Sequence, residues 1–332
     1  MEWYPLRLST SVKQHVFGGR AIADVLGRSG LPDGRVAETW EVSDVDGEVG
    51  VVADGPLAGT PLRDLVREHP ADLVGPGWSG TRFPILTKFI DGAGALPVHV
   101  HADDADAREF EGQENGKTEA WHVLAAGPGA TALAGVRPDV GAERLREALL
   151  AQEFDAVLQR IPVAAGDTVY VPGGMIHSFG PDTLIYEIEQ TSDTQQHAMP
   201  FAMEDGSPVP EEQRRENVEA LLRETHLDAR PTVTDATVPA DDDGVRRAVC
   251  CEGPYFVLHR WRCGHPVRVR REFTTAQVLT NVGPAPVAVR AGAFSGELDR
   301  ASTFLLPAAL GAVEVETAAH GELDVMWGHL PG

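Results

Sequence analysis

Two histidines, His99 and His101, stand two positions apart in a strand-like segment. Side chains at positions i and i+2 of a β-strand project from the same face, so both imidazoles would point into one space. The neutral imidazole is the commonest protein ligand of metal ions. Two histidines at this spacing also occur by chance in many strands, so the pair needs a second, independent feature before it indicates a metal site.

The second feature lies about 65 residues further along the chain. Residues 166–177 match the pattern G-x5-P-x-G-x-x-H through Gly166, Pro172, Gly174 and His177. In physical terms, a glycine turn leads into a strand, proline and glycine end that strand in a tight bend, and the histidine begins the returning strand. This is the second signature of the cupin barrel, and the H-x-H spacing is the core of the first. Found in this order, they predict a metal site.

A carboxylate ligand is the missing part of this site. The usual first cupin signature has a glutamate shortly after H-x-H, but residues 102–106 contain only alanine and aspartate. The segment 115–121 supplies Glu119 as the candidate that closes the site. Two imidazoles and a carboxylate leave coordination positions open, as a catalytic zinc site requires.

Short strand-like runs rich in Val, Ile, Thr and aromatic residues hold these side chains, and 35 glycines and 24 prolines separate the runs. This pattern is typical of an all-β sandwich or barrel, here two cupin (jelly-roll) barrels. Two stretches, about 141–160 and 211–226, instead have apolar residues at helical spacing, and we expect them to be helices packed beside the first barrel. The strand-like runs include residues 39–43, 49–52, 85–90, 96–101, 168–172 and 184–188.

The segment 227–244 is rich in turn residues and ends in an acidic run, which predicts a boundary between two domains. Residues 1–240 would form the catalytic cupin domain with its helical insertions, and residues 245–332 a structural cupin domain. The four histidines of the second segment lack ligand spacing, so we expect no metal there. They are His259, His265, His320 and His329.

Composition excludes several classes of protein. The formal net charge of −22 disfavours binding to nucleic acid or to anionic membrane surfaces. No apolar run reaches the length of a membrane span, and the first residues do not have the pattern of a signal peptide. The three cysteines, of which Cys250 and Cys251 are adjacent, make a poor disulfide framework and suit a reducing cytoplasm. The oligomeric state cannot be predicted from these features.

Several further segments resemble the type I mannose-6-phosphate isomerases, in particular their short bacterial form. The family motifs VHPDD and GKTE correspond to residues 100–104 and 116–119 of this chain, in the same order. The other matching segments are residues 16–19, 38–43, 82–88, 171–177 and 187–193.

The resemblance implies a single zinc-type ion held by His101, Glu119 and His177 in the first cupin. It also implies an aldose–ketose isomerase that moves a proton between C1 and C2 of a sugar or sugar phosphate through an enediol.

The same resemblance suggests which residues act on the substrate. Lys88 and Lys117, two of only three lysines in the chain, fall where the family places lysines near the sugar. Either could hydrogen-bond sugar oxygens, or move a proton if burial lowers its pKa. Glu187 and Asp193 are further acid–base candidates.

Three positions depart from the family pattern. The family has Gln, or sometimes Lys, where this chain has His99, which could be a fourth ligand, a general base or a core histidine. The family's arginine four residues after Asp193 is replaced by His197, which lacks the permanent charge and planar fork that suit a phosphate. Phe179 replaces a tyrosine that often follows the metal histidine.

Three functions therefore stay open. The first is a metal-dependent aldose–ketose isomerase of the mannose-6-phosphate isomerase type with an altered substrate or mechanism. The second is a genuine mannose-6-phosphate isomerase that takes its cation from another arginine. The third is a cupin that binds a sugar or performs other metal chemistry without isomerising.

Overall fold

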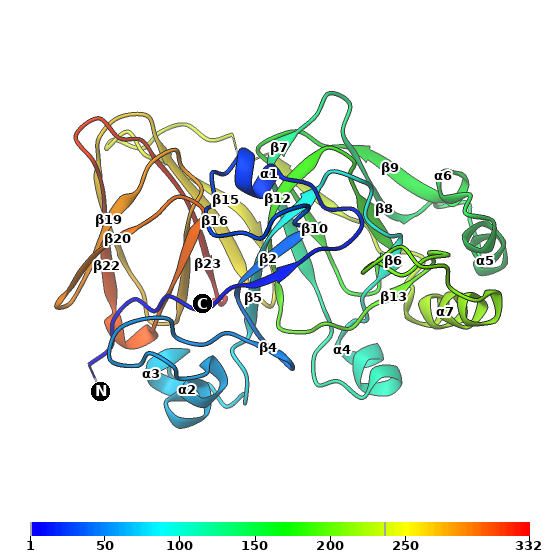
Figure 1. Ribbon diagram of the computed structural model, residues 1–332, viewed down its shortest axis with the longest axis horizontal. Helices are drawn as coiled ribbons and strands as arrows, with labels where there is room; N and C mark the ends of the chain where they lie inside the picture. The colour runs from blue at the N-terminus through cyan, green and yellow to red at the C-terminus, as the bar shows by residue number, and fades with distance from the viewer. Residues whose placement is uncertain (1, 236) are drawn as a thin grey trace.

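The computed structural model describes residues 2–235 and 237–332 and consists mainly of β-strands (Figure 1). The prediction of a protein dominated by β-structure is confirmed. Among the described residues, no helix is long and apolar enough to cross a membrane.

Residues up to 235 form two main sheets and one short β-ribbon. The larger sheet has the strand order β1-β2-β5-β12-β7-β10-β14 and the smaller one the order β13-β6-β11-β8-β9. The strands of the larger sheet are β1 (Ser11–Lys13), β2 (Glu38–Val42), β5 (Ile85–Gly92), β7 (Glu119–Ala126), β10 (Asp167–Val171), β12 (Thr183–Gln190) and β14 (Thr232–Asp235). Those of the smaller sheet are β6 (His99–Val100), β8 (Thr131–Val136), β9 (Leu158–Pro162), β11 (His177–Phe179) and β13 (Gln196–His197), and the ribbon is β3 (Asp44–Val45) with β4 (Glu48–Val49).

Residues 246–329 form two further sheets, with the orders β15-β16-β23-β18-β21 and β17-β22-β19-β20. These strands form no sheet with the strands of residues 11–235. This separation fits a domain boundary near residues 240–245. The boundary itself, and the closure of each pair of sheets into a barrel, stay predictions. The strands are β15 (Arg246–Glu252), β16 (Val257–Cys263), β17 (Arg268–Glu272), β18 (Gln277–Asn281), β19 (Val287–Ala291), β20 (Phe294–Leu298), β21 (Ser302–Leu306), β22 (Ala312–Thr317) and β23 (Leu323–His329).

The two halves pack against each other through a shared apolar core and a few polar contacts. Leu6 forms a β-bridge with Leu305, and the hydroxyl groups of Tyr186 and Thr280 lie 3.0 Å apart between the larger sheet and β18. Burial of this apolar surface joins the halves into one body (Figure 1).

Helices are short and peripheral. Two of them, α5 and α7, cover the smaller sheet of the first half, where Leu145, Leu149, Val218 and Leu221 share a core with Val100. The helices are α1 (Ala21–Asp24), α2 (Leu62–Glu68), α3 (Pro70–Leu73), α4 (Asp104–Asp106), the π-helical η1 (Ala107–Glu111), α5 (Ala142–Ala151), α6 (Phe154–Val157), α7 (Glu211–Glu224) and the 3-10 turn η2 (Ala308–Leu310).

The first expected helix ends earlier than the sequence suggests. Gln152 has a left-handed backbone conformation that ends α5, and from Leu158 the chain is strand β9 rather than helix. The backbone of β9 pairs with β8, with Arg160 opposite Leu133, and this pairing overrides the local helical spacing. The second expected helix is present as α7.

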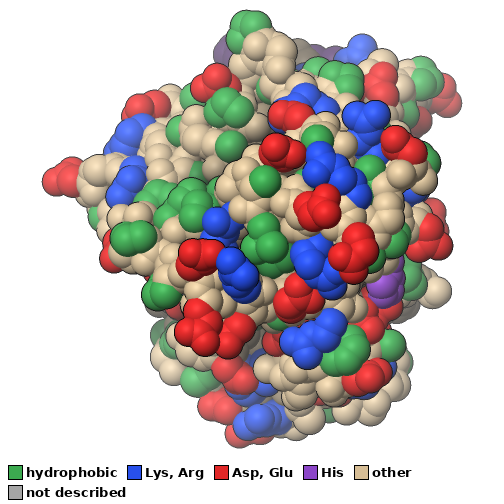
Figure 2. All heavy atoms as spheres, turned by 90° about the vertical axis from the view of Figure 1, so that its right-hand side faces the viewer, with side chains coloured by type: hydrophobic (Ala, Val, Ile, Leu, Met, Phe, Trp, Pro, Cys, Tyr) green, Lys and Arg blue, Asp and Glu red, His purple; other side chains and the backbone are tan. Residues whose placement is uncertain are grey.

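The face that carries α5 and α7 has no patch of a single charge. Acidic and basic side chains alternate over it (Figure 2), and several are paired, such as Arg146 with Glu143 and Glu219. Such a surface gives no basic footprint for a nucleic acid.

Candidate metal centre

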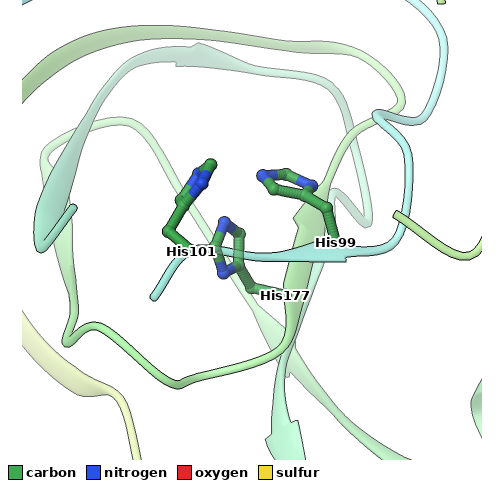
Figure 3. Close-up of side chains that lie close together, drawn as sticks. All are labelled: His99, His101 and His177. Carbon is green, nitrogen blue, oxygen red and sulfur yellow. The ribbon is translucent and has the colours of Figure 1, made fainter. Parts of the chain in front are cut away.

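Three imidazoles converge between the two sheets of the first half (Figure 3). His99 begins β6, His101 follows that strand directly, and His177 begins β11, where it lies opposite His99 in the antiparallel register. One nitrogen from each ring lies within 4.8 Å of the others. The strand period and the proline–glycine bend therefore bring together the histidines that the sequence singled out.

The hydrogen bonds of these rings leave one nitrogen of each facing the others. Every Nδ1 lies 2.7 Å from a backbone carbonyl oxygen, which fixes the proton on Nδ1 and the lone pair on Nε2. The Nε2 of His177 is buried without a hydrogen-bond partner in the described chain. The carbonyl partners are Pro97 for His99, Thr194 for His101 and Met175 for His177.

Glu119, the first residue of β7, faces two of these nitrogens. Its Oε2 lies 3.3 Å from His101 Nε2 and its Oε1 lies 3.1 Å from His177 Nε2. The indole N–H of Trp121 donates to Oε1 at 2.7 Å and so orients the carboxylate. All four groups fit a divalent ion, because they offer lone pairs with supporting hydrogen bonds and a buried nitrogen that nothing else satisfies.

The protonation states suit a metal ligand set. Burial, followed by the positive charge of Lys117, lowers the pKa of His101 to about 3. Burial and the neighbouring rings lower the pKa of His99 well below its usual value. Burial would raise the pKa of Glu119, but the polar rings of His101 and His177 lower it overall. At neutral pH the rings of His99 and His101 are neutral and the carboxylate of Glu119 is charged, as metal binding requires.

A buried network of charges adjoins the ligand cluster. Lys88 on β5 lies opposite Glu187 on β12, and its Nζ is 3.4 Å from Glu187 and 3.0 Å from Glu189. Lys117 Nζ lies 3.3 Å from the other oxygen of Glu189. All of these side chains are at most 5% exposed, so the two ammonium groups and the carboxylates hold one another in place.

No protein-family model matches the chain. The chain is 30% identical over 325 residues to the mannose-6-phosphate isomerase of Streptococcus mutans, with 98% of each chain covered. This chain belongs to the mannose-6-phosphate isomerase family. It is also 28% identical over 322 residues to a mannose-6-phosphate isomerase of Bacillus subtilis, covering 94% of this chain and 96% of the relative.

Solved structures have the same fold. The crystal structure of the Bacillus subtilis mannose 6-phosphate isomerase superposes with a TM-score of 0.86 at 24% identity, over 99% of this chain and all of that one. The apo form of the Salmonella typhimurium enzyme superposes with a TM-score of 0.72 at 13% identity, over all of both chains. Family membership makes this chain an isomerase of the aldose–ketose class, and the ligand cluster is in keeping with a metal-dependent member.

A cavity adjoins the ligand cluster. Its volume is about 290 Å³, and Lys88, Lys117, Glu187 and Asp193 line it together with His101. The structure thus brings four of the five predicted catalytic residues to one space.

His197, the fifth, lies outside that lining. It ends β13 opposite His99, is partly buried, and its Nδ1 accepts a hydrogen bond of 3.3 Å from the backbone N–H of Met199. Burial lowers the pKa of His197, so the ring is neutral at neutral pH. No arginine lines the cavity among the described residues.

The lysines differ from the sequence-based expectation in their protonation. Burial alone would lower the pKa of Lys88 and of Lys117, but Glu189 and the other nearby carboxylates raise both. The condition for proton transfer by a lysine, a pKa lowered by burial, is therefore not met in this arrangement, because the Coulombic attraction exceeds the desolvation. Burial, with the neighbouring carboxylates, instead raises the pKa of Glu187 well above its usual value.

Sequence reasoning missed three residues of this site. Glu189 bridges both lysines, Glu38 Oε2 lies 3.8 Å from Lys88 Nζ, and that Nζ lies 4.4 Å from the centre of the Trp40 ring. Strand alternation could have found Glu189, which follows Glu187 by two positions on β12. The same two-residue period places Glu38 and Trp40 on one face of β2.

The role of His99 can be tested in cobalt-substituted protein. If His99 is a ligand, His99→Ala should weaken metal binding by about ten- to a hundredfold and alter the visible absorption of Co²⁺. His99→Gln, which introduces the residue that the family resemblance leads us to expect there, should recover much of the affinity. An absorption spectrum and metal affinity unchanged in His99→Ala would make His99 a packing residue.

Proposed function

We propose that the protein is a divalent-metal-dependent aldose–ketose isomerase, with zinc as the first choice of ion and iron, cobalt or manganese able to replace it. The observation that supports this most is the meeting of His101, Glu119 and His177 beside a cavity that holds two buried lysines. Two histidines and a carboxylate do not select one metal, so availability decides which ion is bound.

His101, Glu119 and His177 would hold the ion, with His99 as a fourth ligand. When bound, such an ion supplies Lewis acidity that polarises a sugar carbonyl. The chain's own residues then have separate tasks. Lys88 and Lys117 stay charged and donate hydrogen bonds to sugar oxygens, held in position by Glu189. Glu187, whose raised pKa suits a proton carrier, moves the proton between C1 and C2 with Asp193 beside it in the cavity wall.

We further propose that the preferred sugar differs from mannose 6-phosphate. The cavity is lined by the carboxylates of Glu38, Glu119, Glu187, Asp193 and Glu204 but by no arginine among the described residues. All three lysines of the lining, Lys13, Lys88 and Lys117, already have carboxylate partners. An uncharged sugar suits this balance better than a phosphate dianion does.

A second candidate is a genuine mannose-6-phosphate isomerase. The relatives that match over nearly the whole chain have that name. Arg82 offers the missing cation, since it lines an adjoining cavity of about 290 Å³ that also includes Asp193 and Gln195. Arg82 is already paired with Asp46 at 2.7 Å, which weakens this candidate.

Replacing His197 by arginine tests the choice between the two. His197 lies just outside the cavity lining, two positions after the lining residue Gln195, so the longer arginine side chain should extend from there towards the cavity. Because a charge-assisted hydrogen bond to phosphate contributes roughly 1.5–3 kcal/mol, His197→Arg should then raise kcat/KM for mannose 6-phosphate by about ten- to a hundredfold. The measurement is steady-state kinetics on free and phosphorylated mannose. Efficient wild-type turnover of mannose 6-phosphate, unaffected by the substitution, would support the second candidate instead.

The pH dependence of activity on phosphorylated sugars is an independent test of whether His197 acts on the substrate. Burial lowers its pKa, opposed by Glu204, so the ring gains a proton only at more acidic pH than a free histidine. Wild-type activity on phosphorylated sugars, relative to free sugars, should therefore rise only at the acid end of a series from roughly pH 5 to 8. The His197→Arg protein should lose this rise, because arginine keeps its charge throughout.

A further inference from the structure

Arg271 is a positioned arginine between the two sheets of the second half. It lies on β17, and its guanidinium carbon is 5.3 Å from the ring centres of both Trp261 and Trp327. Its Nε–H donates to Gln277 Oε1 at 3.0 Å, and the amide of Gln277 is itself fixed by hydrogen bonds to two backbone carbonyls. The aromatic rings and the amide therefore hold the plane of the guanidinium group in one orientation.

No carboxylate compensates the charge of Arg271. Among residues 2–235 and 237–332, none lies within ion-pair distance of it, and its terminal nitrogens have no hydrogen-bond partner in the protein. Its neighbours on β17 are different, because Arg268 pairs with Glu316 and Arg270 with Glu272 and Glu314. Burial lowers the pKa of Arg271 to about 10. An arginine that is desolvated in this way and has no carboxylate partner is unexpected in a chain with a net charge of −22.

Two histidines face the same space. In the strand register His259 lies opposite Trp327, and His329 lies opposite Gln277, so all four side chains share the inner face of their sheet. The Nε2 atoms of His259 and His329 are 3.0 Å apart, and the rings are stacked. His329 donates its Nδ1–H to the carbonyl of Leu330 at 2.7 Å. Its Nε2 therefore accepts the proton of His259.

The histidine pair is neutral but can take up a proton. Burial, Arg271 and His329 lower the pKa of His259 to about 4, and burial likewise lowers the pKa of His329. Glu252 is the carboxylate that acts on His329, and it opposes this shift only partly. An anion placed between Arg271 and the pair would favour the protonated ring, which would add a second donor.

We propose that Arg271, His259 and His329 form a binding site for a small phosphate-type oxyanion between the sheets of residues 246–329. The free edges of a guanidinium group bind the oxygens of such an anion in pairs, and the proton that the histidine pair takes up supplies a further N–H donor. A divalent cation is disfavoured here, because the charge of Arg271 would repel it. The proposal gives residues 245–332 a ligand as well as a structural role, and it does not depend on the metal centre.

Histidine-selective NMR on the full chain tests the site locally. The ring signals of His259 and His329, assigned with His259→Gln and His329→Gln, should shift saturably with millimolar inorganic phosphate, towards the positions of a protonated ring. Arg271→Gln should weaken this binding by about ten- to a hundredfold. Arg270→Gln, a neighbour on the same strand that already has carboxylate partners, is the matched control and should bind as the wild type does.

Titrations with two ligands, inorganic phosphate and mannose 6-phosphate, distinguish the source of the phosphate group. Equal shifts with inorganic phosphate and with mannose 6-phosphate would show that the site binds the phosphate alone, and tighter binding of the sugar phosphate would show that it also contacts the sugar. The proposal is overturned if phosphate causes no saturable shift of either ring in wild type, if Arg271→Gln responds unchanged, or if zinc shifts both rings and phosphate does not. If Arg271→Gln fails to fold, the titration of the wild-type protein with phosphate still tests the proposal.

Discussion

Replacing His101 and His177 together by alanine should remove the divalent ion and lower kcat/KM for the preferred sugar by at least about a thousandfold. The two imidazoles supply half of the proposed ligands, and the polarisation that the ion provides contributes several kcal/mol to the reaction. Glu119 and His99 would remain, but these two ligands alone hold a divalent ion far more weakly than the full set of four. Elemental analysis of the purified protein and steady-state kinetics measure the two effects.

The matched control for this double substitution is His320→Ala, because His320 is an exposed histidine that belongs to neither proposed site. It should retain metal and activity. Thermal unfolding curves must show that the double variant is folded, since both histidines are at most 2% exposed. A folded double variant that contains as much metal as the wild type would place the ion elsewhere, for example at the cluster of Asp103, Asp106 and His226.

Lys88→Met is expected to affect stability and activity together. Methionine nearly matches the length of the lysine but leaves Glu187 and Glu189 without the ammonium group that lies 3.4 Å and 3.0 Å from them. Removing one partner of a buried ion pair costs about 3–5 kcal/mol, because the remaining charge is uncompensated. The free energy of unfolding should fall by that amount, and the proposed hydrogen bond to the sugar would be lost as well. Denaturant unfolding and kinetics measure both.

Two variants separate charge compensation from packing. Lys88→Met combined with Glu189→Gln removes one charge of each sign and should recover part of the lost stability, but not the activity. Lys13→Met is the control lysine, since its pair with Glu48 is partly exposed and should contribute less than about 1 kcal/mol. If Lys88→Met were as stable as Lys13→Met, the buried network would not have the energetic role described here.

Local spacing was enough to predict that the three histidines converge. His99 and His101 follow from the two-residue period of a strand, and His177 from the bend that precedes it, so short-range geometry determines where they point. Spacing alone did not identify Glu119. Only the match of residues 116–119 to a family motif distinguished it from the chain's other carboxylates. The fold class was predictable for a similar reason, since turn residues and short apolar runs are local signals.

Long-range pairing explains what the sequence could not predict. His197 was predicted to be a catalytic residue, yet it pairs with His99 between β13 and β6 and lies outside the cavity lining. His259 and His329 are 70 residues apart and meet only through the register of β16 with β23. The protonation of Lys88 depends on carboxylates from two other strands. Local sequence patterns do not determine which strands pair, so they cannot predict these contacts between distant residues.

The measurement that tests the central claim most directly is the conversion of aldose to ketose by metal-loaded and metal-free protein. A panel of free and phosphorylated aldoses, mannose and mannose 6-phosphate among them, is followed by NMR with protein of known zinc content. We predict that the zinc-loaded protein forms the ketose from at least one sugar, that a chelator abolishes the conversion, and that added zinc restores it. Folded, zinc-loaded protein that isomerises no sugar of the panel, or that works equally well without metal, would contradict the account.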